Sequence, residues 1–191
     1  MPENTNILDK YQTILKETHK IKNPIYIYIS RVAIDYTQIT ESISRTNWDL
    51  DEILSQHNNY VDVILKQIKQ LIADVESLHL MSLLKAKTLS TLLEQCIKLI
   101  MRMLVDGYSS VKKCSNEGRA LMQLDFQQLV VKLEKMCNIR PIPDKDYVEA
   151  YIKAFYMPDT SIEKWIKEHP VFFSFCLRVV INLNNSERPH F

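Results

Sequence analysis

The stretch TNWDLDEILSQHNNYVDVILKQIKQLIADVESL, residues 46–78, carries the strongest fold signal in the chain. Thr46 or Asn47 can cap a helix, and the acidic residues that follow suit the positive end of a helix dipole. From residue 50 onward the apolar residues alternate steps of four and three, which is the heptad pattern of a coiled-coil helix. We therefore predict a long helix that begins at residues 46–49. Its heptad seam consists of Leu50, Leu54, His57, Val61, Ile64, Ile68, Leu71, Val75 and Leu78.

This 50–78 seam can be used in two ways. One set of its positions is filled by the β-branched residues Val61, Ile68 and Val75. This distribution is compatible with a two-stranded coiled coil, in which two helices pair. Such pairing supports a freestanding coiled-coil homodimer that acts as a scaffold. A helix that packs inside its own bundle needs the same apolar face. We favour the internal use and keep the homodimer as the alternative.

Two helices are expected before this segment. A short helix carries apolar residues from Ile7 to Leu15 and ends near residues 20–22, where basic side chains suit a C-terminus. Asn23 and Pro24 then resemble a cap and a first helical position, and the apolar period behind them continues to about residue 44. The rival is a strand over residues 25–29, which are rich in β-branched and aromatic side chains. Because the helical period extends over far more residues, we predict a helix over residues 24–44.

Further helices are expected after residue 78. A broad apolar face spans residues 80–105, Ser115 can cap the next helix, and Asp144 can cap another after an extended Pro-x-Pro segment. A capping box at residues 160–163 opens one more. The predicted fold is all-α, an elongated helical bundle or rod of about six to eight helices. Residues 1–170 form its single rod domain, and residues 171–191 form a divergent tail.

The composition limits the classes of protein that fit. The chain contains only two glycines, and sheets with many tight turns normally need more. Lys and Arg number 24 against 23 Asp and Glu, so the net charge of +1 argues against a nucleic-acid partner. The four cysteines are far apart and form no CxxC pair, as expected of reduced thiols in the cytosol. We see no secretory signal, and the longest apolar stretch, residues 171–183, is too short to span a bilayer.

Motifs for covalent, phosphate or metal chemistry are missing from the sequence. Gly107 and Gly118 are too far apart to form a phosphate-binding loop. The five histidines show no metal-ligand spacing, so we expect no metal and no cofactor. We therefore predict a protein that is not an enzyme and takes no small-molecule substrate. An enzyme with a dispersed active site is the remaining hypothesis, and it would need polar groups that converge in a pocket.

Two features suggest contacts with partners. His57 lies on the apolar 50–78 seam, where it acts either as a pH-sensitive latch or, as we favour, as a hydrogen-bonded core or rim histidine. Lys112, Lys113 and Arg119 form a basic cluster between two helices, which could contact an acidic partner or anionic lipid headgroups. The common alternative for such a cluster is a solvated surface.

Five stretches of the chain resemble the C-terminal region of the syndetin family, whose members are the coiled-coil subunit of the endosome-associated recycling protein (EARP) complex. KKCSNEGRALMQLDFQQ is the most distinctive run within them. Residues 65–104 are less similar, and the ending after His169 differs from the further amphipathic helix expected of the family. The resembling stretches are NPIYIYISRVAIDYTQI (23–39), RTNWDLDEILSQHNNYVD (45–62), GYSSVKKCSNEGRALMQLDFQQL (107–129), IRPIPDKDYVEAYIKAFY (139–156) and IEKWIKEH (162–169).

This resemblance implies a function as well as a fold. It implies a helical-rod subunit, or a fragment of one, in a complex that tethers vesicles during recycling from endosomes to the plasma membrane. The implied partners are SNARE proteins and the core subunits shared with the Golgi-associated retrograde protein (GARP) complex. The implied location is cytoplasmic, peripheral on recycling endosomes and on trans-Golgi network membranes. The family has no catalytic or cofactor residues to transfer to this chain.

Overall fold

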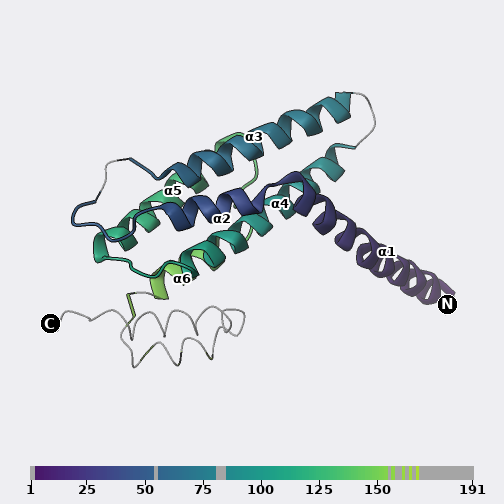
Figure 1. Cartoon of the computed structure of the whole chain (residues 1–191). Helices are drawn as coiled ribbons and strands as arrows, with labels where there is room; N and C mark the ends of the chain where they lie inside the picture. Colours follow the sequence, from purple (N-terminus) through teal and green to yellow (C-terminus); the bar gives the residue numbers. More distant parts are fainter. Residues whose placement is uncertain are drawn as a thin grey trace.

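The computed structural model describes residues 3–53, 56–80, 85–154, 156, 157, 161, 164 and 167. These residues form six α-helices and no strand, which confirms the predicted all-α class (Figure 1). In chain order the helices are α1 (Glu3–Ala33), α2 (Tyr36–Arg45), α3 (Asn59–Leu80), α4 (Ala86–Ser109), α5 (Asn116–Cys137) and α6 (Lys145–Ala154).

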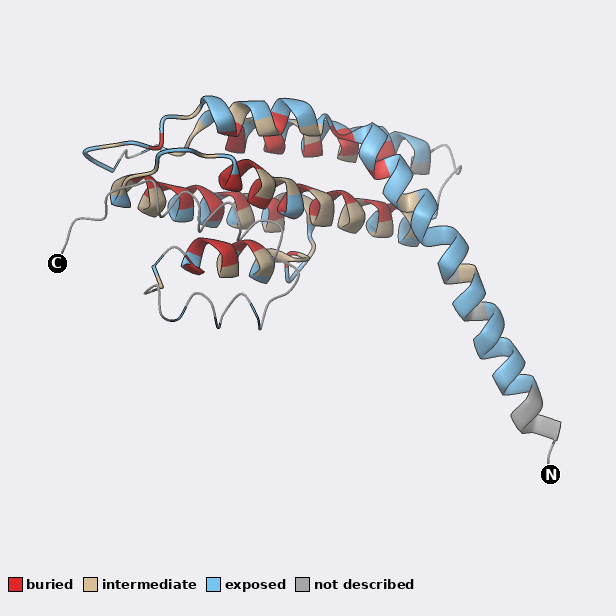
Figure 2. Cartoon of the chain, turned by 60° about the horizontal axis from the view of Figure 1, so that its bottom comes forward, coloured by how far each residue is buried: buried red, intermediate tan, exposed pale blue. Residues whose placement is uncertain are grey.

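Helix α4 lies at the centre of the bundle. It contacts α1, α2, α3 and α6, while α5 packs between α3 and α6. The bundle helices turn their buried residues toward one another, and their outer faces are exposed (Figure 2). Burial of apolar surface contributes about 25 cal/mol per Å², so this shared core is the main source of stability. The fully buried side chains of α4 are Cys96, Ile97, Ile100, Met101, Leu104, Val105 and Tyr108.

Helix α1 is longer than the sequence predicts. It continues through Pro24, so the predicted boundary at residues 20–24 is wrong. The proline has no N–H for the carbonyl of Lys20, but α1 is exposed at both residues and water can reach that carbonyl. The break occurs instead at Asp35, whose carboxylate accepts a hydrogen bond from Gln38 N at 3.0 Å and caps α2. The rival strand over residues 25–29 is likewise wrong, since these residues are helical.

The long helix predicted to begin at residues 46–49 begins instead at Asn59. The connection before it is held by other hydrogen bonds, which compete with helix formation. Asn47 Oδ1 accepts from Asp49 N at 3.1 Å, a local turn bond that replaces the expected helix cap. Trp48 O accepts from Ser115 N at 3.0 Å, so its carbonyl bonds to the start of α5.

The later boundaries agree better with the sequence. Ser115 caps α5, because its side chain accepts a hydrogen bond from Gly118 N. Residues 138–144 are non-helical, as the two prolines require, and α6 begins directly after Asp144. The capping box at residues 160–163 and the tail at 171–191 lie outside the described residues, apart from residue 161.

Gly107 permits the close packing of α2 on α4. A Cβ atom at this position would lie 2.7 Å from Cδ1 of Ile43, a fully buried residue of α2. No residue with a side chain fits here unless Ile43 moves. The glycine sits inside a helix and has no positive φ, so the close approach of the helices accounts for it.

We expect Gly107→Ala to lower the free energy of unfolding by about 1 kcal/mol. Alanine gains up to about 1 kcal/mol in helix propensity, but overpacking against Ile43 costs roughly 1–3 kcal/mol. Denaturant unfolding measures the difference, with exposed Ser90→Ala on the same helix as control. Ile43→Val removes the clashing Cδ1 atom, so G107A/I43V should lose less stability than the two single losses added. A G107A chain that is as stable as the wild type contradicts this packing.

Candidate functional site

The segment over residues 46–50 docks on the N-terminus of α5. Leu50 N donates a hydrogen bond to Ser115 Oγ at 3.0 Å, and Ser115 N donates to Trp48 O at 3.0 Å. Gly118 lies directly beneath, and a Cβ atom there would come within 1.9 Å of Trp48 O. Both glycines of the chain therefore serve close contacts. At Gly118 the contact is between the connection and α5.

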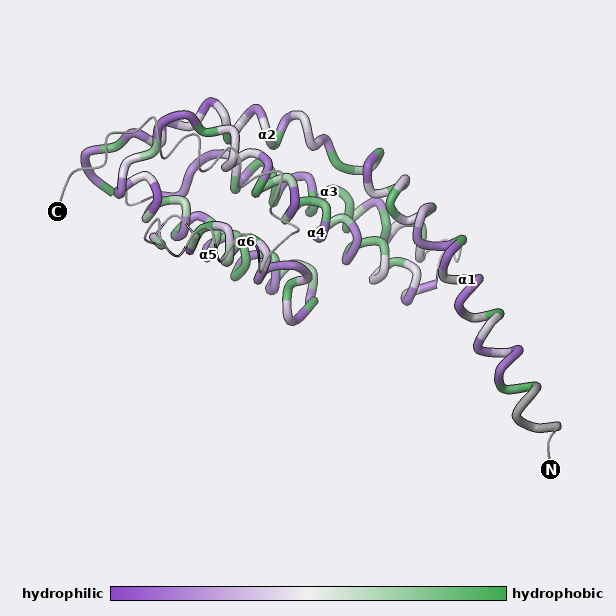
Figure 3. The backbone as a smooth tube through the Cα atoms, turned by 90° about the horizontal axis from the view of Figure 1, so that it is seen from below, coloured by the Kyte–Doolittle hydropathy of each residue, from purple (hydrophilic) through white to green (hydrophobic). Residues whose placement is uncertain are grey.

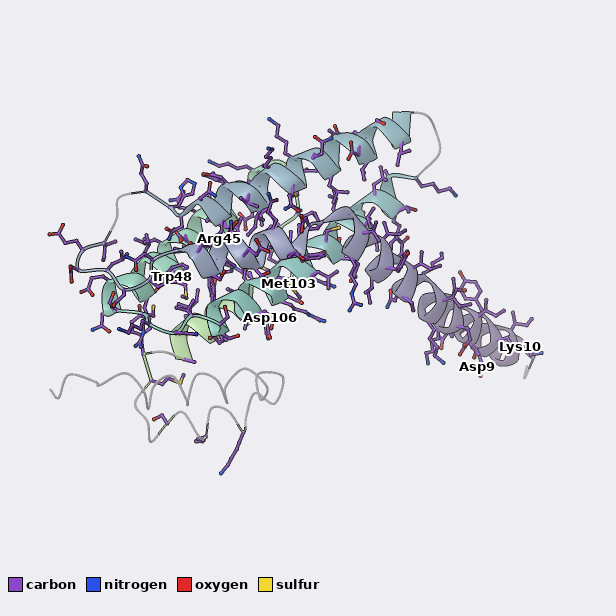
Figure 4. All side chains as sticks on the ribbon, in the orientation of Figure 1. Asp9, Lys10, Arg45, Trp48, Met103 and Asp106 are labelled. Atoms are coloured by element: carbon purple, nitrogen blue, oxygen red, sulfur yellow. The ribbon has the colours of Figure 1, made fainter. Side chains whose placement is uncertain are left out.

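Three aromatic rings fill the space under this connection. Trp48 is 3% exposed, and its ring centroid lies 6.0 Å from those of Tyr60 and Tyr108. The two tyrosine rings meet edge to face at 6.2 Å, a favourable aromatic geometry. Trp48 Nε1 donates to Ile43 O at 3.1 Å, so the indole N–H is also satisfied. Figure 4 places Trp48 at the end of the bundle away from α1.

A buried chain of hydrogen bonds runs beside these rings. The hydroxyls of Tyr60 and Tyr108 are 2.9 Å apart, and Tyr60 also bonds to the carboxylate of Asp125. A carboxylate only accepts, so Tyr60 donates to Asp125 and Tyr108 donates to Tyr60. Asn58 donates to the same carboxylate twice, from its backbone N at 3.1 Å and from Nδ2 at 2.8 Å. These hydrogen bonds connect α3, α4 and α5 to one another, and Asn58 adds the residue just before α3.

Burial shapes the acidity of these groups. Asp125 is fully buried, and desolvation raises the pKa of its carboxyl, although the hydrogen bonds from Asn58 lower that pKa in part. Desolvation also raises the pKa of Tyr60 well above its ordinary value and raises that of Tyr108. Both phenols therefore stay protonated at neutral pH and act as donors.

The Tyr108–Tyr60–Asp125–Asn58 network stabilises the fold and does not have the properties of a reactive site. Its groups are buried and bonded to one another, and neither described pocket is lined by them. Among the described residues, no group of three or more His, Cys, Asp or Glu side chains is placed to hold a metal ion. Burial also raises the pKa of the thiols of Cys96, Cys114 and Cys137, the last to about 11, so these cysteines are poor nucleophiles.

His57 is a hydrogen-bonded rim histidine, as we favoured from the sequence, but it does not lie on a helix. It precedes α3, where its Nε2 lies 2.9 Å from Asp62 Oδ1 and 3.3 Å from Lys132 Nζ. Its side chain is 25% exposed, so it is a rim residue that joins the start of α3 to α5. The prediction that it sits on an apolar helix face is wrong.

The predicted basic cluster is divided by the structure. Lys112 and Lys113 are exposed in the connection between α4 and α5. They line an open pocket of about 490 Å³ together with residues 44 and 46–49, at and after the end of α2. Arg119 lies in α5, half-buried, and its guanidinium bonds to Cys114. The two lysines thus share a surface with the docked 46–49 segment, which the sequence did not indicate.

The 50–78 seam is divided between the bundle core and the connection. Val61, Ile64, Ile68, Leu71 and Val75 of α3 are buried against the chain's own helices. Leu50 and His57 lie in the connection, Leu78 is 37% exposed, and Leu54 lies outside the described residues. A second copy of the chain cannot pack on the five buried positions while the bundle is intact.

An exposed apolar face on α1 is the feature that the sequence reasoning missed. Most of α1 projects from the bundle, and apolar and polar residues alternate along it (Figure 3). The spacing of its apolar residues was visible from Ile7 to Tyr11 and beyond. Treating Pro24 as a helix start divided this face in two and hid its length. We name as the α1 stripe the residues Ile7, Tyr11, Ile14, Thr18, Ile21, Ile25, Tyr28 and Val32.

Comparison with known proteins points to one family. Residues 1–189 match the family model described as "Syndetin, C-terminal". Syndetins of Rattus norvegicus and Mus musculus are each 44% identical over 173 residues, and that of Gallus gallus is 43% identical. These alignments cover 91% of this chain but 18% of each relative, so the chain spans a small part of their length. No solved structure matches the chain significantly.

The hydrogen-bond network predicts that removing one buried hydroxyl lowers the free energy of unfolding, and that removing its partner as well lowers it no further. Tyr60→Phe leaves the buried Tyr108 hydroxyl unpaired and removes a donor from Asp125, so it should cost roughly 1–3 kcal/mol of unfolding free energy. Adding Tyr108→Phe removes the unpaired hydroxyl, so the double variant should be no less stable than Tyr60→Phe alone. Denaturant unfolding measures both. Tyr28→Phe, at a tyrosine 70% exposed, is the control, and an equal effect at Tyr28 and Tyr60 contradicts the network.

Proposed function

The chain belongs to the syndetin C-terminal family, and we propose that it is a non-catalytic part of a multisubunit vesicle-tethering complex. In this proposal the complex acts in endocytic recycling from endosomes to the plasma membrane. The match to the family model over residues 1–189 is the single observation that carries the proposal. The helical bundle supports it, because rigid helical rods suit a protein that works by binding.

The proposal assigns partners and a location to the chain. The partners are the subunits that the EARP complex shares with the GARP complex, together with SNARE proteins, all bound through protein–protein contacts. The chain acts in the cytoplasm, peripherally on recycling endosomes and on trans-Golgi network membranes. Among the described residues, no helix combines the length and the apolar character needed to cross a bilayer.

We place one contact on the face around Lys112 and Lys113. Both side chains are exposed beside the open pocket that residues 44 and 46–49 help to line. Two adjacent cations next to a hollow suit an acidic segment of a partner subunit, or anionic headgroups when the complex sits on a membrane. Arg119, half-buried in α5 with its guanidinium bonded to Cys114, is the least accessible member of the predicted cluster.

The second candidate, a homodimeric scaffold, is favoured by one observation. The α1 stripe is an apolar helix face that the described residues leave exposed. It differs from the 50–78 seam on which the sequence placed the dimer. The two functions are compatible, because a subunit of a tethering complex can also associate with its own copies.

We expect the tagged chain to capture EARP and GARP subunits and SNAREs from cytosol, identified by mass spectrometry. Lys112→Glu/Lys113→Glu should reduce that recovery about fivefold or more, which corresponds to roughly 1 kcal/mol of lost binding. Lys66→Glu/Lys69→Glu changes the charge equally at two exposed residues of α3 and is the matched control. Recovery of none of these proteins by the folded wild-type chain would count against the tethering function.

The lipid part of the proposal has its own test. The wild-type chain and the K66E/K69E control should float with vesicles that contain phosphatidylserine, and less with neutral vesicles, because each cation near an anionic surface contributes about 1 kcal/mol. The K112E/K113E variant should stay in the unfloated fraction. Lipid contact at this face is ruled out if the wild-type chain floats equally with both kinds of vesicle. It is also ruled out if the K112E/K113E variant floats as well as the K66E/K69E control.

A further inference from the structure

The α1 stripe has the spacing of a coiled-coil interface. Its residues alternate steps of four and three from residue 7 to residue 32 without an exception. This spacing keeps one face of two supercoiled helices in continuous contact. Four of its positions, Tyr11, Thr18, Ile25 and Val32, take the heptad place called a. The other four, Ile7, Ile14, Ile21 and Tyr28, take the place called d.

The stripe is unoccupied by the described part of the chain. Its apolar members are between 52% and 72% exposed, Ile25 the least and Val32 the most. The bundle contacts a different side of α1, through Tyr26, Ser30 and the adjoining Ile34, of which the last two are 0% and 2% exposed. The stripe therefore faces away from the bundle along its whole length, and most of α1 is exposed in Figure 2.

Resting on the homodimeric alternative given under the proposed function, we propose that the α1 stripe binds the same stripe of another copy of this chain, in a parallel coiled coil. The repeat is long enough for this, since about four heptads of contact sustain a coiled coil when the core positions are apolar. Each bundle lies on the side of its own α1 away from the stripe. Two bundles can therefore stand side by side at one end without overlapping the interface.

The flanking charges select the parallel orientation. In a parallel pair, the g residue of one heptad meets the following e residue of the other helix. This rule places Glu17 of one copy beside Lys22 of the other, and the symmetry forms the pair twice. In an antiparallel pair with the same overlap, Lys10 meets Arg31, which repel each other. Glu17 bonds to Lys20 of its own helix at 2.7 Å, an exposed ion pair that is easily exchanged.

A second copy fits the stripe better than a lipid surface does. An amphipathic helix on a membrane needs a strongly basic polar face, whereas the polar residues of α1 include Asp9 and Glu17 among the lysines. Figure 4 shows Asp9 and Lys10 next to each other near the N-terminal end of α1. Isoleucine at d positions is compatible with three strands as well as two, so the interface accepts either number of copies.

Light scattering after size-exclusion chromatography tests the association. The full chain, injected from about 1 to about 100 µM, should have a mass two or three times 22.5 kDa at the upper concentrations. Ile14→Lys/Ile21→Lys places charges in the stripe, so its dissociation constant should rise at least about 100-fold and its mass should be that of one chain. These positions are exposed in the single chain, so the bundle is untouched.

Gln12→Lys/Asn23→Lys adds the same charge at exposed positions outside the stripe and should associate like the wild type. Helix content by circular dichroism should agree between this control and the stripe variant at low concentration. A wild-type chain that has the mass of one copy at every concentration overturns the proposal, and so does a stripe variant that associates as well as the control. A wild-type monomer whose flotation with vesicles is lost in the Ile14→Lys/Ile21→Lys variant, and kept in the Gln12→Lys/Asn23→Lys control, would assign the stripe to lipid instead.

Charge exchange tests the orientation. Glu17→Lys and Lys22→Glu each place like charges across a parallel interface, so each should weaken association by about fivefold or more. The double variant restores opposite charges and should associate like the wild type. A double variant as weak as the single variants overturns the parallel arrangement.

Discussion

The arrangement of the molecule depends on how closely α2 and the 46–50 connection approach the two helices beneath them. Gly107 lets Ile43 of α2 lie against the backbone of α4, and Gly118 lets the carbonyl of Trp48 lie against α5. Both contacts bury apolar side chains that would otherwise stand away from the core. The two glycines thus determine how the N-terminal half of the bundle fits on the C-terminal half.

Local sequence signals were sufficient where the backbone satisfies its own hydrogen bonds. The Ser115 cap and the proline-marked connection before α6 depend on residues within a few positions of each other, and the sequence located both. The start of α3 depends on contacts across more than sixty residues, as in the bond from Leu50 N to Ser115 Oγ. No periodicity within one segment encodes such a partner, so residues 46–49 were assigned to a helix.

The candidate surfaces were predicted only in part, because contacts between distant segments also decide which residues are exposed. Exposure of Lys112 and Lys113 follows from their place between two helices, but the pocket beside them is formed by a distant segment. The apolar period of residues 50–78 identified a face of α3 without showing that its own bundle covers it. The same kind of period in α1 faces solvent. The sequence pattern alone does not distinguish a covered face from an exposed one, because both require the same residues.

The projecting part of α1 also has a mechanical consequence. Residues 3–25 form a helix about 35 Å long at 1.5 Å per residue. A stiff arm of this length converts a small rotation at its base into a large displacement at its tip. A tilt of about 10° where α1 meets α2 at Asp35 would move the N-terminal end of α1 by roughly 8 Å. The direction in which the arm points is set by the packing of the base of α1 on α4, together with the hydrogen bonds that Gln67 of α3 makes with Asp35.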